Sequence, residues 1–428
     1  MRAFAFAVLV FGAALGACRV EEVATGSPRS VAGTGAIPLA TARSYLDEYA
    51  GLAAADGGKL WGRSLAGPFL FVDPGTRQVV ANERDAQGKL AARDGVFVGR
   101  LGDDDMIANT SVEWSGTRWT MVMWDDDFAE DAARRRRLML HEAFHRVQPA
   151  LGLVAAGEPN EHLDTRDGRY WLQLEWNALE TAIASPPVAA AAIADALAFR
   201  AARRRAFPEA AARENALEIH EGLAEYTGAR ASGTSEADAV AAVRARRQAT
   251  SGFVRSFAYV SGPLYGYLLD RTGDDWRRGL GKDSDLGALL ARRARVDVPA
   301  SGDAERWGGI ALGTAEDTRE AERQVRLRAW RVALVEGPVL AIDLTTVTSG
   351  SFDPRKVHAF ASNQVVYTSR TLVAPWGKLT MEDGAMLEDR ASARAFVSLS
   401  RRDWTLRLEP GWTLAPGERS GDRRIVRR

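Results

Sequence analysis

The stretch His141-Glu142-Ala143-Phe144-His145 lies within a segment, 132–147, that contains neither glycine nor proline. This composition predicts a helix, and residues four apart on a helix share a face, so both imidazoles can reach the same ion. Histidine nitrogens are common ligands of zinc. Glu142 stands one position further round the helix, where its carboxylate can take a proton from metal-activated water without binding the metal. The stretch therefore predicts a zinc site with Glu142 as the general base.

The motif is specific, because the chain has only five histidines. A chance His-Glu-x-x-His is expected on the order of once in a few hundred chains of this kind. The alternative interpretation is that both histidines are surface or helix-packing residues that bind no metal.

A catalytic zinc needs a third protein ligand, and four acidic residues are candidates. Asp164 lies in a stretch that resembles a turn and helix cap. Glu175 lies in the almost wholly apolar segment 170–179, where a buried carboxylate needs a partner, either the metal or an arginine or histidine. Glu221 and Glu225 lie close together further along the chain. The residues alone leave this choice open.

The stretch His220-Glu221-Gly222-Leu223-Ala224-Glu225-Tyr226 resembles the Glu-Gly-x-Ala-x-Tyr ligand helix of the gluzincin branch of the zincin metallopeptidases. The resemblance implies a zinc ligand set of His141, His145 and Glu221, with Glu225 orienting a ligand histidine. Asp164 has the spacing at which many gluzincins place their glutamate. The metzincin branch is excluded, since its glycine and third histidine would fall at Gln148 and Leu151. The separation from His145 to Glu221 exceeds that of the aminopeptidase-like families, and requires the helices of 169–207 to be an insertion beside the site.

The segment 259–269 resembles the helix that follows the ligand helix in gluzincins, where a tyrosine often stabilises the developing oxyanion. Tyr259 and Tyr265 are the candidates, and we expect Tyr259 to be the catalytic one. The alternative is that both tyrosines pack in the core.

The N-terminus has the features of an export signal. An apolar run, 3–15, is too short to span a bilayer comfortably and ends at Leu15-Gly16-Ala17-Cys18. This resembles the lipobox of bacterial lipoproteins, which implies a signal peptide over 1–18, a lipid anchor on Cys18 and a place in the bacterial cell envelope. The alternative is a plain secretory signal. A Gly/Ser/Ala/Thr-rich tether follows over 19–36.

Hydrophobic periodicity predicts an α+β protein of zincin-like fold. A helix over 41–55 precedes an antiparallel sheet over 66–124, whose last strand, Arg118–Trp124, presents an exposed edge to a peptide substrate. The motif helix, predicted over Ala129–Pro149, follows. The zincin-like domain is expected over 37–335, with mainly helices after 168, and a β-rich C-terminal domain over 336–428.

Taken together, these features predict zinc-dependent hydrolysis of peptide bonds in a peptide or protein substrate. The balance of 56 basic and 56 acidic residues gives no reason to expect a nucleic-acid partner. The first alternative is a degenerate zincin that serves as a surface binding or scaffold lipoprotein. The second is a metal-free envelope protein with a chance motif.

Overall fold

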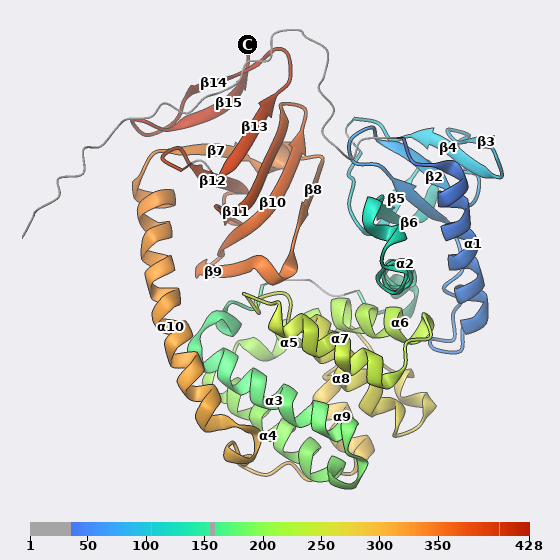
Figure 1. The fold of residues 1–428 in the computed structure, drawn as a ribbon, viewed down its shortest axis with the longest axis vertical. Helices are drawn as coiled ribbons and strands as arrows, with labels where there is room; N and C mark the ends of the chain where they lie inside the picture. The colour runs from blue at the N-terminus through green and yellow to red at the C-terminus, as the bar shows by residue number, and fades with distance from the viewer. Residues whose placement is uncertain (1–35, 104, 155–158, 402) are drawn as a thin grey trace, which may run out of the picture.

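The computed structural model describes residues 36–428 except 104, 155–158 and 402 (Figure 1). The predicted anchor at Cys18 and all but the last residue of the predicted tether, 19–36, lie outside the described residues. Within those residues the protein is α+β, as predicted: an N-terminal sheet, a helical middle region and a C-terminal sheet follow one another along the chain. No helix of this part of the chain is long and apolar enough to cross a bilayer.

The N-terminal sheet has six strands among the described residues, in the order β3-β4-β2-β1-β6-β5. Alternate side chains of its strands divide between two cores: Phe69 and Phe71 pack toward helix α1 (Leu39–Asp56), while Leu70 and Val72 belong to the opposite face. The predicted helix over 41–55 is therefore confirmed. The strands are β1 (Phe69–Val72), β2 (Gln78–Ala81), β3 (Ala91–Arg93), β4 (Val96–Arg100), β5 (Thr110–Trp114) and β6 (Thr117–Met123).

Two expectations about this sheet are wrong. The sheet is not purely antiparallel, because β1 and β6 pair in parallel, with Phe69 opposite Thr120. The segment Arg118–Trp124 does not present a free edge either, since β6 lies between β1 and β5 and pairs with both. The alternation of apolar residues fixes which face a side chain occupies, but it does not report which strand becomes the neighbour.

The motif helix, α2 (Ala132–Val147), packs between the N-terminal sheet and the helical region (Figure 1). It is shorter than the predicted Ala129–Pro149. The side chain of Asp131 caps its first turn by accepting from the Arg134 amide, and short 3₁₀ turns precede and follow it. Its buried residues Met139, Leu140 and Phe144 fix it in the core.

The helical region confirms the predicted run of helices. Helices α5 and α6 are joined by a π-helical turn over Glu218–Gly222, so that they form one irregular helix. The helices after α2 are α3 (Arg166–Ala184), α4 (Ala189–Ala206), α5 (Ala210–Leu217), α6 (Leu223–Ala231), α7 (Glu236–Gln248), α8 (Ala258–Asp270), α9 (Leu286–Ala294) and α10 (Gly309–Arg331).

The C-terminal sheet confirms the predicted β-rich region. In the described part of the chain its strands run β14-β15-β7-β12-β11-β10-β8, with β13 on β11 and β9 on β10, over a core of its own. A single bridge, between Ile107 and Ser349, joins it to the chain that leads into β5. Its strands are β7 (Val339–Asp343), β8 (Ser349–Phe352), β9 (Val357–Ala361), β10 (Gln364–Ala374), β11 (Gly377–Asp389), β12 (Arg394–Ser398), β13 (Trp404–Leu408), β14 (Trp412–Pro416) and β15 (Arg423–Arg427).

Candidate metal centre

His141 and His145 lie one helical turn apart on α2, and their side chains are only 6% and 9% exposed because the helix packs against α6. Helices α2 and α6 approach closely because α6 has Gly228 at the contact. A Cβ on that glycine would lie 2.6 Å from the carbonyl oxygen of Arg137 on α2. Any larger residue would push the two helices apart.

Glu221 reaches the histidine pair from the π-helical turn between α5 and α6. The turn packs directly on α8, where a Cβ on Gly262 would lie 2.2 Å from the carbonyl oxygen of Gly222. Single π-helical turns within α-helices are rare and frequent at functional sites. Here the turn gives Glu221 its position opposite α2.

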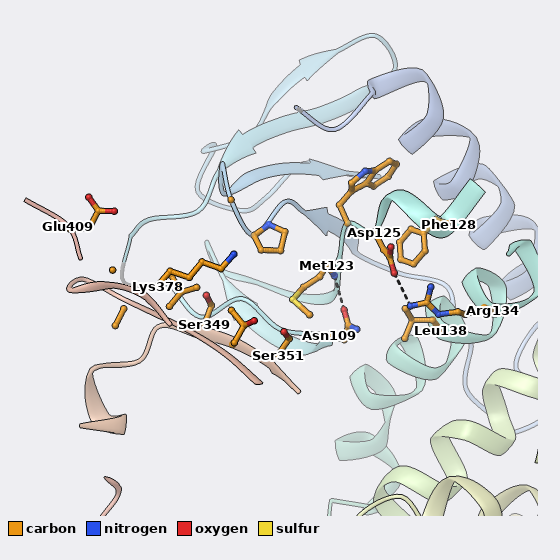
Figure 2. A pocket seen from close by; sticks show the side chains of 18 residues that line it. Asn109, Met123, Asp125, Phe128, Arg134, Leu138, Ser349, Ser351, Lys378 and Glu409 are labelled. Carbon is orange, nitrogen blue, oxygen red and sulfur yellow. Dashed lines mark hydrogen bonds and ion pairs between the residues drawn. The ribbon is translucent and has the colours of Figure 1, made fainter. Parts of the chain in front are cut away.

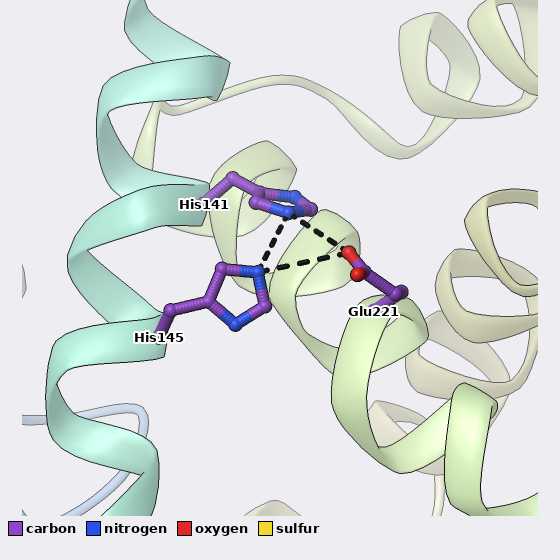
Figure 3. A group of neighbouring side chains, drawn as sticks. All are labelled: His141, His145 and Glu221. Atoms are coloured by element: carbon purple, nitrogen blue, oxygen red, sulfur yellow. Dashed lines mark hydrogen bonds and ion pairs between the residues drawn. The ribbon is translucent and has the colours of Figure 1, made fainter. Parts of the chain in front are cut away.

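Three ligand atoms converge at one point (Figure 3). The Nε2 atoms of His141 and His145 are 3.1 Å apart, and the Glu221 Oε2 atom lies 3.5 and 3.6 Å from them, respectively. Zinc–ligand bonds of about 2.0–2.2 Å in a tetrahedral site place the ligand atoms about 3.4 Å apart. The observed triangle therefore has the dimensions of one face of a zinc coordination tetrahedron. Among the described residues, this is the one group of at least three histidines, cysteines or acidic residues whose ligand atoms lie within 4.8 Å of one another.

The other nitrogen of each imidazole is held by a hydrogen-bond acceptor. The Nδ1 of His145 lies 2.6 Å from Oε1 of Gln148, whose amide group donates to the carbonyls of Ile219 and His220 and is thereby fixed in orientation. The Nδ1 of His141 lies 3.4 Å from Oε2 of Glu225. Neutral histidines in this arrangement carry their protons on Nδ1 and direct both Nε2 lone pairs at the same point. Two Nε2 atoms 3.1 Å apart repel each other when both are unprotonated, so the pair favours either a proton or a metal ion at this point.

In the sequence, Gln148 stands out only as the residue at the position of the metzincin glycine. Its spacing of three residues from His145 was the signal that could have identified its contact with the ligand, because such residues are neighbours on a helix.

The charge of the centre favours a cation. Burial lowers the pKa of His141, but hydrogen bonds to Glu221 and Glu225 outweigh it and raise that pKa to about 10. Burial opposes ionisation of Glu221, yet hydrogen bonds from His141 and His145 hold its pKa well below the usual value. The carboxylates therefore favour protonated histidines in the metal-free protein. A divalent ion that bound there would displace those protons.

Glu142 lies beside the ligand atoms without joining them. Its Oε1 is 4.0 Å from the Nε2 of His141, and its Oε2 is buried with no hydrogen-bond partner among the described residues. Burial raises the pKa of this carboxyl group. An unsatisfied buried carboxylate oxygen at this position suits a group that accepts a proton from a molecule held at the centre.

Tyr259 lies at the centre and Tyr265 does not. The ring of Tyr259 stacks on His141 at 5.8 Å between centroids, and its hydroxyl donates to Glu221 Oε2 at 2.8 Å. Burial and the Glu221 carboxylate hold the pKa of this hydroxyl well above its usual value, so that it remains a donor. Tyr265 instead donates to Glu175.

The two rival third ligands, Glu175 and Asp164, are occupied elsewhere. Glu175 is fully buried and accepts from Arg200 and Arg203 as well as from Tyr265. Asp164 accepts from the backbone amide of Ala359 on β9 and so joins the helical region to the C-terminal sheet. The partner that the buried Glu175 carboxylate requires is therefore arginine.

Comparisons with protein-family models, curated proteins and solved structures all gave no match. The function has to be inferred from the geometry of the site.

Proposed function

We propose that this protein is a zinc-dependent peptidase of gluzincin type, in which His141, His145 and Glu221 hold the metal. The proposal rests above all on one observation, the convergence of two imidazole lone pairs and a carboxylate oxygen at tetrahedral spacing. The order of sheet, motif helix and ligand helix along the chain also supports the proposal.

Each group near the ligands has a role in peptide hydrolysis. Zinc bound there would polarise the peptide carbonyl and lower the pKa of water. Glu142 would accept a proton from that water at Oε2 and deliver it to the departing amine. Tyr259 donates its one hydroxyl proton to Glu221 in the metal-free site, and would turn that proton to the developing oxyanion when substrate binds. Glu225 and Gln148 would fix the histidine tautomers.

The second candidate function is a metal-holding zincin that binds partners without hydrolysing them. It is favoured by the low exposure of the ligand side chains, which is 6% for His141 and 12% for Glu221. A substrate carbonyl must reach this centre for catalysis, whereas a structural metal needs no access.

The first test is the metal content. The chain expressed from residue 19, stripped with chelator and dialysed against zinc, is expected to contain about one zinc per molecule by elemental analysis. His141→Ala is the matched control and is expected to contain almost none. At a free zinc concentration of 100 times Kd, binding should stabilise the fold by about 2.7 kcal/mol. A parent protein without zinc after this treatment would refute the proposal.

We also propose that Cys18 anchors the protein to the cell envelope. Cys18→Ser is expected to abolish labelling with a fatty-acid analogue and either to block processing or to release the protein from the membrane fraction. If the parent carried no label, and the parent and the variant were retained in the membrane fraction to the same extent, the signal would be an ordinary secretory one.

A further inference from the structure

A cavity of about 740 Å³ lies between the C-terminal sheet and the N-terminal half of α2 (Figure 2). One wall is a sheet face. Ser349 and Ser351 on β8 point to the same side, and Val373 and Lys378 continue the row of Ser349 across β10 and β11. We call these four residues the sheet wall. The opposite wall includes Arg134 and Leu138 of α2, with Trp124 and Phe128 before it.

The cavity and the metal centre share one stripe of α2. Arg134, Leu138, His141 and His145 are spaced four, three and four residues apart, which places them on one face of the helix. Leu138 lies about 4.5 Å along the axis from His141, at 1.5 Å per residue. The stripe therefore leads from the cavity towards the ligand histidines.

Strand β8 leads from the cavity to the same centre. It pairs with β10 on one side, while its other edge is joined, among the described residues, only at Ser349 through the bridge to Ile107. Beyond the sheet wall it ends at Phe352, which is 41% exposed. The guanidinium of Arg255 lies 5.8 Å from the centre of the Phe352 ring and 3.9 Å from Glu221 Oε1. Arg255 therefore links the end of β8 to the metal ligand Glu221.

The charged groups of the cavity differ in how they are neutralised. Arg134 forms an ion pair with Asp125 at 2.8 Å. Lys378 forms no ion pair or side-chain hydrogen bond with the described residues, and its amine points into the cavity, while Glu409 lies at the outer margin (Figure 2). The sheet wall therefore presents, at the exposed Lys378, a cation without an ion-pair partner among the described residues, which a carboxylate would complement.

We infer that the cavity and the free edge of β8 bind an extended peptide with an acidic side chain, and that Lys378 selects this side chain. The inference rests on the proposed peptidase function and names its substrate class. Extended chains add to exposed strand edges through backbone hydrogen bonds, and pockets for alternate side chains give the selectivity. At about 3.3 Å per residue, Ser349 lies about 10 Å from Phe352. The acidic residue is accordingly expected about three to five residues from the scissile bond.

The test uses zinc-loaded Glu142→Gln protein and fluorescent decapeptides in which one glutamate, glutamine or lysine is moved through an Ala/Gly frame. Binding is measured by anisotropy. We expect glutamate to be preferred at one position by about two- to fivefold over glutamine, as for a partly exposed ion pair, and the preference to shrink as salt is added. Adding Lys378→Glu should reverse the preference. Arg427→Glu is the matched control, since Arg427 is exposed on β15, remote from β8 in the sheet, and should leave it unchanged.

The same peptides with Glu142 intact separate the two proposals. A Lys378-dependent preference in binding without any cleavage would support the binding site and refute the peptidase. Cleavage with the same specificity in Lys378→Glu and in the parent would support the peptidase and overturn the role of Lys378. If the parent neither bound nor cleaved the peptides, both proposals would be refuted.

Discussion

Glu142→Gln is expected to retain about one zinc per molecule while kcat for peptide hydrolysis falls by about 10²- to 10⁴-fold, the usual contribution of a general base. The carboxylate is not among the converging ligand atoms, so its replacement leaves the metal set intact. The amide has nearly the same shape but cannot accept a proton at neutral pH. Because Glu142 is buried with an unpartnered oxygen, the neutral amide should cost little stability.

The measurement is kcat on any peptide that the parent cleaves, together with zinc content. Glu130→Gln is a suitable control, since Glu130 is exposed just before α2 and has no place at the centre. Full activity in Glu142→Gln would rule out the proposed mechanism. A parent with tightly bound zinc and no activity on any peptide would favour the metal-holding scaffold.

Glu221→Gln and Glu175→Gln are expected to have opposite effects. The first should lose zinc affinity, since a ligand carboxylate is replaced by a poorer ligand, while its unfolding in chelator stays close to that of the metal-free parent. The second should keep zinc and lose stability, because it removes the carboxylate paired with Arg200 and Arg203. Breaking a buried pair costs about 3–5 kcal/mol. The loss should fall at the lower end, since Arg200 keeps Glu218.

Zinc content and denaturant unfolding in chelator, measured on both variants and the parent, decide between these roles. If Glu175→Gln lost zinc and Glu221→Gln kept it, the ligand assignment would be reversed. If both variants kept zinc, the Glu221 carboxylate would not be needed to bind the metal.

The centre was partly predictable because half of it is local. The spacing of His141 and His145 fixes a shared helix face whatever the rest of the fold does. Glu221 lies 76 residues after His145 in the sequence, so the residues alone left it among four candidates, and only the resemblance of its surroundings favoured it. The partner of Glu175 was open for the same reason, since Arg200 and Arg203 come from another helix.

The fold was predictable to the level of its elements and not of their pairing. Periodicity located α1, the β-rich character of the C-terminal region and the change from strands to helices near residue 125, but only some of the C-terminal strands. The parallel pairing of β1 and β6 depends on which strands meet after β5 folds back, and hydrophobic alternation is the same for both directions.

The π-helical turn over Glu218–Gly222 lets one irregular helix direct carboxylates at two separate groups of basic side chains. Before the turn, Glu214 neutralises arginines of α4, and within the turn Glu221 faces the histidines of α2. Deleting one residue of the turn would restore regular α-helix, but would rotate α6 against α5 by about 100°. Either the arginines or the histidines would then lose their carboxylate. Such a deletion would make the helix regular but would remove one of these contacts. The π-helical turn therefore allows the salt bridges to α4 and the metal ligand Glu221 to lie on neighbouring turns of one helix.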